Sequence, residues 1–428
     1  MSDNSGNSGN SNNGNSGGGG GLWLVDFAFD MVNKRRIKKH NQQSRGLEQY
    51  KSITTDVLFP IESYNESILI SGGSVDERMR FSEQILSNCV TNNQPMIILH
   101  VGNSGLEQMV GQRGYGMTAS KYNKQFDVFT SFSLPEMFQI MMDTCKSKYD
   151  IKPAGRYILQ IVHELLTAKK QRPYFANCVN VPLHQLSAEI NNALAGSLIT
   201  QDAADNLNSL LMMGQAEIPK IDSFFYDIKA QCGHVQTDKP GGTSILSAIK
   251  NSKILCIDLN SSGNTLLVEL IVNSLTIAMN RGFGFTFFLD DVAAANNELL
   301  KNALCQRSGH NSVICSKDFY ALMNGNDNAF NTLVGEAEKT VLLSHGSHIS
   351  CEKWSKFIGE YDKIDVQKNT TGGWSHQHGG YNYGNNYGQT TMDKREFKIK
   401  PEEINRLSAS EVIVYDNQTG SLFKTQVV

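Results

Sequence analysis

The sequence has few of the features that mark a secreted, zinc-binding or membrane-spanning protein. Its eight cysteines are scattered, with no C-x-x-C pair and no histidine spacing that would complete a zinc site. The N-terminus lacks the charged, apolar and small-residue order of a signal peptide, and no run of about 20 apolar residues could cross a bilayer. We therefore expect reduced thiols, no metal site and a cytoplasmic protein.

A strong charge of either sign is also absent. The chain has 39 basic and 42 acidic residues among 428, which gives a formal net charge of −3. This balance excludes a protein whose whole surface attracts nucleic acid, and it leaves open a local basic face or the basic pore of a ring. The length and the 40% of hydrophobic residues suffice for one large α/β domain and a smaller one.

Three segments stand apart from this domain by composition. Residues 1–21 are almost entirely Ser, Asn and Gly and are expected to be disordered, and the Gly/Tyr/Asn-rich residues 370–391 are expected to form a flexible loop. Residues 22–47 begin with an apolar helical face and continue with the basic cluster 34–39 (KRRIKK). This segment is predicted to be an amphipathic helix that packs on its own domain, or else rests on a membrane surface or a partner.

The rest of the chain alternates short apolar runs with helical stretches, which predicts an α/β fold with a mostly parallel sheet flanked by helices. The predicted strands are 67–70, 95–101, 126–129, 253–259, 285–289, 312–315 and 340–344, with a closing hairpin at 411–415 and 421–425. Residues 151–236 have helical periodicity instead. We therefore expect an inserted all-helical subdomain between a first part of the α/β domain, 48–150, and a second part, 237–428.

The residues after the first strand have the position of a phosphate-binding loop without its chemistry. Such loops need glycines that let backbone N–H groups surround the phosphates, a lysine that reaches them, and Ser or Thr for Mg²⁺. Aligned on the first glycine, Glu77 replaces the last glycine, Arg78 the lysine and Met79 the hydroxyl residue. The candidate cofactor-binding residues are Gly72, Gly73, Ser74, Val75, Asp76, Glu77, Arg78 and Met79.

These replacements predict weak or absent binding of ATP with Mg²⁺. Glu77 brings a negative charge to the place where triphosphate should approach, Met79 has no hydroxyl for the metal, and the planar fork of Arg78 does not replace a compact ammonium. A strand, two glycines and a helix also occur in many α/β proteins that bind no phosphate.

A second candidate is the pair of acids that ends the strand 285–289. In P-loop ATPases the first acid orients Mg²⁺ and the second, usually Glu, polarises the attacking water. Asp290 and Asp291 take these positions, but Asp291 is one methylene shorter than Glu, so that a catalytic water would be out of easy reach. Two acids after a strand are equally typical of a helix N-cap without catalysis.

The order and spacing of these segments resemble the VirD4/TraG/TraD coupling proteins of conjugation and type IV secretion, over about residues 48–428. The resemblance rests on the loop near Gly72, the helical insertion, the strand FTFFLDD, the segment NALCQRSGHNSVICSKDF and the closing KPEEINRL. It implies a RecA-like P-loop NTPase-type fold. It also places Arg307 near a trans-acting arginine and Lys317 at a sensor position that is normally Gln. Alternatively, Arg307 is a solvated helix-end residue and Lys317 pairs with Asp318 or Asp290.

Members of this family form ring hexamers that couple ATP hydrolysis to the movement of DNA or protein. The candidate catalytic residues are then Asp290, Asp291, Arg307 and Lys317, and the cofactors are ATP and Mg²⁺ if the site is active. The expected partners are further copies of this chain in an oligomer such as a ring, secretion or conjugation components, and DNA. A membrane would be met only peripherally, at its inner face, or through a partner.

Four departures, at Glu77, Met79, Asp291 and Lys317, all point toward lost activity. They favour a pseudo-ATPase that acts in substrate recruitment or assembly. Two alternatives remain: an active ATP-driven DNA or protein translocase completed by a neighbouring subunit, and a structural scaffold of a phage or mobile element.

Overall fold

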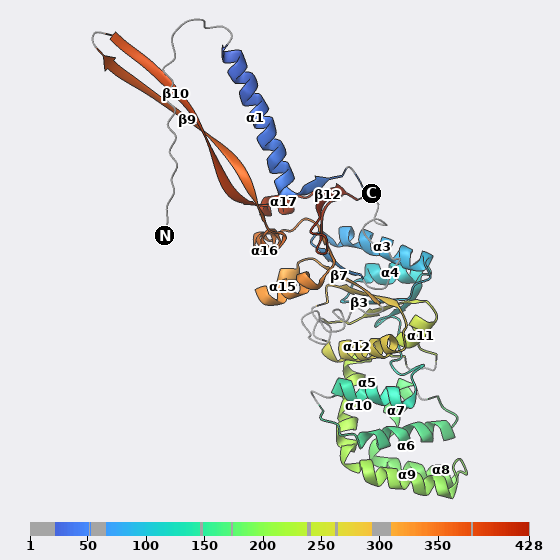
Figure 1. The fold of residues 1–428 in the computed structure, drawn as a ribbon. Helices are drawn as coiled ribbons and strands as arrows, with labels where there is room; N and C mark the ends of the chain where they lie inside the picture. Colours follow the sequence, from blue (N-terminus) through green and yellow to red (C-terminus); the bar gives the residue numbers. More distant parts are fainter. Residues whose placement is uncertain are drawn as a thin grey trace. The chain divides into compact units, whose positions relative to one another are not determined.

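The computed structural model describes residues 22–50, 52, 66–145, 149–172, 174–237, 241–261, 264–292, 310–377 and 380–427 (Figure 1). The chain divides into two compact units. One unit combines residues 1–47 with 360–398, and the other combines 48–359 with 399–428. The tail predicted at 1–21 lies outside the described residues.

The larger unit is built on a ten-stranded sheet with the order β1-β12-β11-β8-β2-β7-β6-β3-β5-β4. Neighbouring strands run parallel from β4 across to β8, and β11 is antiparallel to both β8 and β12. The strands are β1 (Leu47–Gln49), β2 (Ser67–Ser71), β3 (Met96–His100), β4 (Gly116–Ala119), β5 (Ile254–Asp258), β6 (Phe285–Asp290), β7 (His310–Ser316), β8 (Lys339–Leu342), β11 (Glu411–Asp416) and β12 (Leu422–Gln426). The predicted α/β class with a mostly parallel sheet is confirmed.

The central strands are buried on both faces because helices cover both. Every residue of β3, β5 and β6 is buried, as is usual for parallel strands in α/β proteins. Helices α3 (Val75–Thr91) and α4 (Ser104–Gln112) lie on one face, and α11 (Ile245–Lys250) and α12 (Thr265–Asn280) on the other (Figure 1). The cysteines whose burial is described are free and buried: Cys89, Cys178, Cys232, Cys256, Cys315 and Cys351.

The described residues between β4 and α11 are helical wherever their secondary structure is regular, apart from isolated bridges. Its helices are α5 (Leu134–Cys145), α6 (Gly155–Ala168), α7 (Phe175–Asn180), α8 (Leu186–Ala195), α9 (Gln201–Gly214) and α10 (Ile218–Cys232), with the short 3-10 helices η1 (Leu183–Gln185) and η2 (Gln215–Glu217). The apolar positions of α6 that predict a helix are buried, including Ile158, Ile161 and Leu165. That this segment forms a subdomain of its own stays a prediction.

The structure lacks one predicted strand and contains one short strand, β4, that the sequence does not predict. Residues 126–129 form no strand, because the Asp127 carboxylate accepts the backbone N–H groups of Phe129 and Phe175 at 3.0 and 3.1 Å and so turns the chain. Only isolated bridges remain at Phe126. Strand β4 is not predicted from the sequence, since its four residues include glycine and do not alternate.

The C-terminal part of the larger unit adds α14 (Phe319–Leu322), α15 (Asp327–Glu336), α16 (His348–Ile358) and α17 (Pro401–Asn405). In the described part of the chain, none of the helices has both the length and the apolar character to cross a bilayer.

The smaller unit contains one long helix and one long hairpin. The helix is α1 (Leu22–Arg45), and the hairpin consists of β9 (Glu360–Gln377) and β10 (Gly380–Phe397). The structure therefore has strands where the sequence predicts a flexible loop at 370–391. Pairing is continuous from Glu360 and Phe397 to Gln377 and Gly380. Since the pairing groups are on the backbone, a Gly- and Asn-rich sequence can extend a hairpin that its better strand formers begin.

Candidate functional site

A short turn connects β2 to α3. Ser71 is the last residue of β2 and Val75 the first of α3, so that residues 72–74 alone connect them. In a phosphate-binding loop, four residues separate the two glycines that precede the lysine. Here Glu77, Arg78 and Met79 lie inside the helix instead.

The backbone N–H groups of this turn are already bonded within the protein. Gly72 donates to the carbonyl of Ser316 at 3.0 Å, and Gly73 donates to the carbonyl of Ser344 at 2.7 Å. The Ser74 N–H donates to Glu77 Oε2 at 2.7 Å. In a phosphate-binding loop these donors would point at the anion. In this structure each of the three donates to an acceptor within the chain.

Glu77 holds the place of an anion at the start of α3. Its carboxylate accepts the Ser74 N–H, while the Ser74 hydroxyl accepts the Glu77 N–H at 3.2 Å, which completes a capping box. A negative side chain at a helix N-terminus is favourable because the helix dipole is positive there. Glu77 is thus an internal substitute for a bound anion as well as an obstacle to one.

Arg78 turns back onto the turn rather than outward toward a ligand. Its Nη1 donates to the carbonyls of Gly73 at 2.9 Å and Gly72 at 3.3 Å, and its Nη2 lies 3.0 Å from Asp291 Oδ2. The Arg78 side chain is 6% exposed and the Asp291 side chain 39%. The guanidinium therefore joins the turn after β2 to the end of β6. The structure brings these two predicted residues together, but in an ion pair.

Asp291 is bonded through both carboxylate oxygens. Besides the Arg78 contact, its Oδ1 accepts the Ser316 hydroxyl at 2.8 Å and the Lys317 backbone N–H at 2.9 Å. Its backbone has a positive φ of 50°, which is uncommon for a residue with a side chain. This conformation aims the carboxylate at the end of β7. Asp291 therefore acts as a structural bridge between strand ends.

Asp290 has a different environment from Asp291. It is buried, and its Oδ2 accepts the Asn103 amide at 2.6 Å. Burial raises the pKa of Asp290, and the Asn103 bond opposes the rise. The same amide lies 3.6 Å from the Met79 sulfur. The two acids thus point to different neighbours.

The remaining predicted site residues do not converge on the turn. The Lys317 side chain is exposed, and within the described residues no ion pair joins it to Asp290 or Asp318. Val75 and Asp76 are exposed in the first turn of α3. Arg307 lies outside the described residues.

His345 is a site residue that was not predicted from the sequence. Its Nδ1 lies 2.8 Å from the carbonyl of Leu343, and its Nε2 lies 2.8 Å from the Ser71 hydroxyl. Because a carbonyl only accepts, Nδ1 carries the proton and Nε2 accepts from Ser71. Burial lowers the pKa of His345, which keeps the ring neutral. The one available signal is that His345 follows a predicted strand, so that it belongs to the edge of the sheet where strands end.

A second polar cluster lies at the same edge of the sheet. His100 ends β3 and is in register with Asp258 of β5 and Asp290 of β6. Its Nδ1 accepts the Asn103 N–H at 3.1 Å, and its Nε2 is 3.9 Å from Glu107. Burial lowers the pKa of His100 to about 4. Across the described residues, no group of three or more His, Cys, Asp or Glu is arranged to hold a metal ion.

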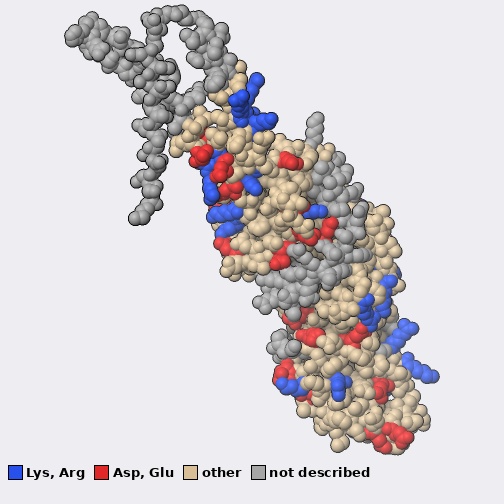
Figure 2. Space-filling model, viewed as in Figure 1, with Lys and Arg blue, Asp and Glu red and all other residues tan. Residues whose placement is uncertain are grey.

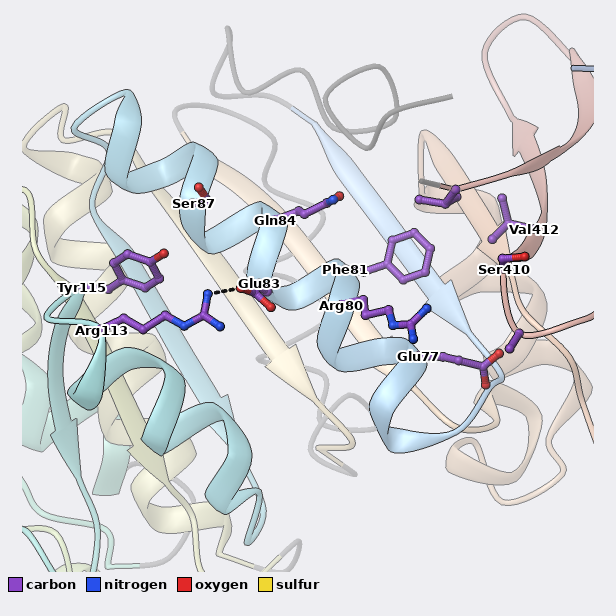
Figure 3. A pocket seen from close by; sticks show the side chains of 12 residues that line it. Glu77, Arg80, Phe81, Glu83, Gln84, Ser87, Arg113, Tyr115, Ser410 and Val412 are labelled. Atoms are coloured by element: carbon purple, nitrogen blue, oxygen red, sulfur yellow. Dashed lines mark hydrogen bonds and ion pairs between the residues drawn. The ribbon is translucent and has the colours of Figure 1, made fainter. Parts of the chain in front are cut away.

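A cavity of about 570 Å³ lies along α3, away from the turn (Figure 3). Its lining includes Phe81, Gln84 and Ser87 of α3 and Val412 of β11. Glu77 is the one turn or capping residue in this lining. The cavity therefore does not provide a phosphate pocket at residues 72–74.

The comparisons with known proteins place the fold. No protein-family model matches the chain, and no curated protein matches it. Among solved structures, the unbound monoclinic form of the bacterial conjugative coupling protein TrwBdeltaN70 is 15% identical, with a TM-score of 0.53 over 92% of this chain and 91% of that chain. The plasmid coupling protein TrwB in complex with ADP and Mg²⁺ is 14% identical, with a TM-score of 0.51 over 92% of both chains.

At this identity the similarity shows the fold alone. The RecA-like P-loop NTPase-type sheet is confirmed, as is the expected resemblance to the coupling proteins at the level of the fold.

Gly72 should tolerate no side chain. A Cβ at this position would lie 2.7 Å from the His345 ring and from the Ser344 carbonyl, at a φ of 97°. We expect Gly72→Ala to lower the free energy of unfolding by about 3 kcal/mol, through strain and overpacking together. Gly102→Ala is the matched control, since φ is also positive at 65° and no atom lies within 4 Å. It should cost about 1 kcal/mol. Equal losses in urea denaturation would show that the turn is not closely packed.

Stability should depend on the buried ring of His100. The pKa of this residue is about 4 in the folded protein, against 6.5 for an unperturbed histidine, so the unfolded chain takes up the proton first as the pH falls. The stabilisation is complete above pH 6.5 and is lost toward pH 4. Between about pH 7 and about pH 5, the wild type should lose about 2 kcal/mol more unfolding free energy than His100→Asn. Identical pH dependence of the two proteins would contradict a buried neutral ring.

Proposed function

We propose that this protein is a coupling-protein-like component of a conjugation or type IV secretion system, and that it acts as a pseudo-ATPase in substrate recruitment or assembly. The observation that carries the proposal is the closed turn after β2. The N–H groups of Gly72, Gly73 and Ser74 are all bonded to acceptors within the chain. The fold shared with TrwB supports the kind of system. Since fold does not imply function, the site decides the activity.

Opening the turn for a nucleotide would require several bonds to break together. Neutral hydrogen bonds contribute about 0.5–1.5 kcal/mol each and those to charged groups about 1.5–3 kcal/mol. The bonds at stake are the three backbone bonds of the turn and the Arg78 contacts with Asp291 and the glycine carbonyls. Nucleotide binding would be weakened by the sum of these contributions. Glu77 would have to be displaced as well, since its carboxylate repels phosphate.

The residues present also do not fit Mg²⁺ and a catalytic water. Met79 offers a thioether where the metal needs a hydroxyl. Asp290 is buried against Asn103, and both oxygens of Asp291 already have partners. No acid at this edge, among the residues that the structure describes, is therefore placed to orient a metal and polarise water as P-loop ATPases require. The proposal therefore includes no ATP hydrolysis by this chain.

The protein should not bind ATP with Mg²⁺ at concentrations up to about 1 mM, the upper range of ordinary enzyme substrates. Calorimetric titration of the full chain measures binding, and phosphate release with and without single-stranded DNA measures hydrolysis. Arg78→Ala and the exposed control Arg80→Ala should both stay inactive. Hydrolysis that Arg78→Ala abolishes and Arg80→Ala leaves intact would identify an active translocase and overturn the proposal.

As an assembly component, the protein should form a homo-oligomer. Light scattering coupled to gel filtration measures the mass of the full chain in solution, and dilution tests its stability. We expect a mass several times that of the 47.4 kDa chain. A monomer that persists at high protein concentration would argue against any ring and would favour a role in which the fold serves as a monomeric scaffold.

A further inference from the structure

The C-terminal half of α1 carries basic side chains and no acidic ones. Residues 31–45 of this helix contain no Asp or Glu. Arg35, Arg36, Lys38 and Lys39 are exposed, and within the described residues none of the four forms an ion pair. Figure 2 shows basic side chains clustered where α1 lies in Figure 1. Like charges three and four residues apart repel each other on a helix. An anionic partner would relieve that repulsion.

Contacts with the hairpin set the rotation of the helix. Asn41 donates its amide to the Ile364 carbonyl and accepts the Ile364 N–H, both at 2.9 Å. Arg45 Nε donates to the Lys398 carbonyl at 2.6 Å. Since each helical residue turns by about 100°, these contacts direct Arg35, Arg36 and Lys39 away from β9. Lys38 lies on the side of the hairpin, where it lines a pocket together with Asp365 of β9. Arg35, Arg36 and Lys39 therefore face outward.

The same face carries apolar side chains one turn earlier. Met31 is 43% exposed and Val32 is 45% exposed. By helical geometry Met31 lies above Arg35 and Lys38, and Val32 lies above Arg36 and Lys39. The sequence of the preceding turns of α1 is LWLVDFAFD, in which aliphatic and aromatic residues accompany Asp26 and Asp30. The helix thus passes from an apolar end to a basic end.

We propose that the outward face of α1 binds the surface of an anionic lipid bilayer. Met31 and Val32 would lie at the boundary of the acyl chains, and Arg35, Arg36 and Lys39 would lie at the phosphate headgroups. This order matches the depth profile of a leaflet, in which apolar side chains penetrate and basic ones remain with the headgroups. A nucleic acid would use the charges alone and would leave the apolar pair in water. The proposal concerns only the smaller unit and is independent of the nucleotide site.

Vesicle co-sedimentation of the full chain tests the proposal. Binding should be strong to phosphatidylcholine vesicles with about 30% phosphatidylglycerol, weak to pure phosphatidylcholine, and reduced when salt rises from about 0.1 to about 0.5 M. A fourfold variant, Arg35→Gln, Arg36→Gln, Lys38→Gln and Lys39→Gln, should bind anionic vesicles about 100-fold more weakly. The matched control removes the same charge from exposed positions of the larger unit: Lys170→Gln, Arg172→Gln, Lys253→Gln and Arg406→Gln.

A second variant separates lipid from nucleic acid. Met31→Ser with Val32→Ser should weaken vesicle binding about tenfold, because two apolar side chains no longer enter the bilayer. It should leave any binding of a DNA duplex unchanged. The proposal is overturned if vesicle binding ignores lipid charge or if the matched control loses as much as the fourfold variant. It is also overturned if the apolar pair has no effect on vesicles while the fourfold variant loses duplex binding, since the face would then serve a nucleic acid.

Discussion

The backbone N–H groups at the start of α3 need acceptors, and the rest of the site follows from where those acceptors lie. In this protein the chain supplies them: the carbonyls of Ser316 and Ser344 and the carboxylate of Glu77. The sheet order makes this arrangement possible, because β2 lies between β7 and β8, and both neighbours end at the same edge. The donors that would attract a phosphate in an open loop instead join three strand ends to one helix.

The charged residues of the site take their roles from this closure. Arg78 pairs with Asp291 and donates to the carbonyls of Gly72 and Gly73, so its charge is directed inward. His345 packs over Gly72 as a neutral ring, which closes the turn from the other side. The similar fold of TrwB has been solved in complex with ADP and Mg²⁺. In this chain the N–H groups of the turn after β2 donate to acceptors within the protein. The same sheet supports either arrangement because catalysis depends on a few residues at one edge.

The smaller unit follows different physical rules. Among the contacts that join its helix and hairpin are the two hydrogen bonds between Asn41 and Ile364. The side of α1 that faces away from the hairpin carries exposed basic residues. The basic residues of α1 and the turn after β2 therefore belong to separate units of the chain.

Much of the fold and part of the site were predictable from the sequence alone. Continuous apolar runs determine buried parallel strands because only a sheet covered on both faces can hide them, and the order of those runs indicated the coupling-protein fold. The replacements at Glu77, Arg78 and Met79 could be read from the alignment on Gly72. The short strand β4 and the full length of the β9–β10 hairpin could not be predicted from the sequence. Their residues are weak strand formers, which pair only when a neighbouring strand offers its backbone.

Only the tertiary structure shows which contacts Glu77, Arg78 and His345 make. That Glu77 caps its own helix, that Arg78 reaches Asp291, and that His345 covers Gly72 all depend on side chains meeting across the edge of the sheet. Arg78 and Asp291 are 213 residues apart in the chain, and Ser71 and His345 are 274 apart. The sequence by itself determined which residue types stand at Glu77, Arg78 and Met79, and from them it predicts weak or absent nucleotide binding. The partners of Arg78 and Ser71 were decided by the tertiary structure, because hydrogen-bond partners so distant in sequence are set by strand order and not by local pattern.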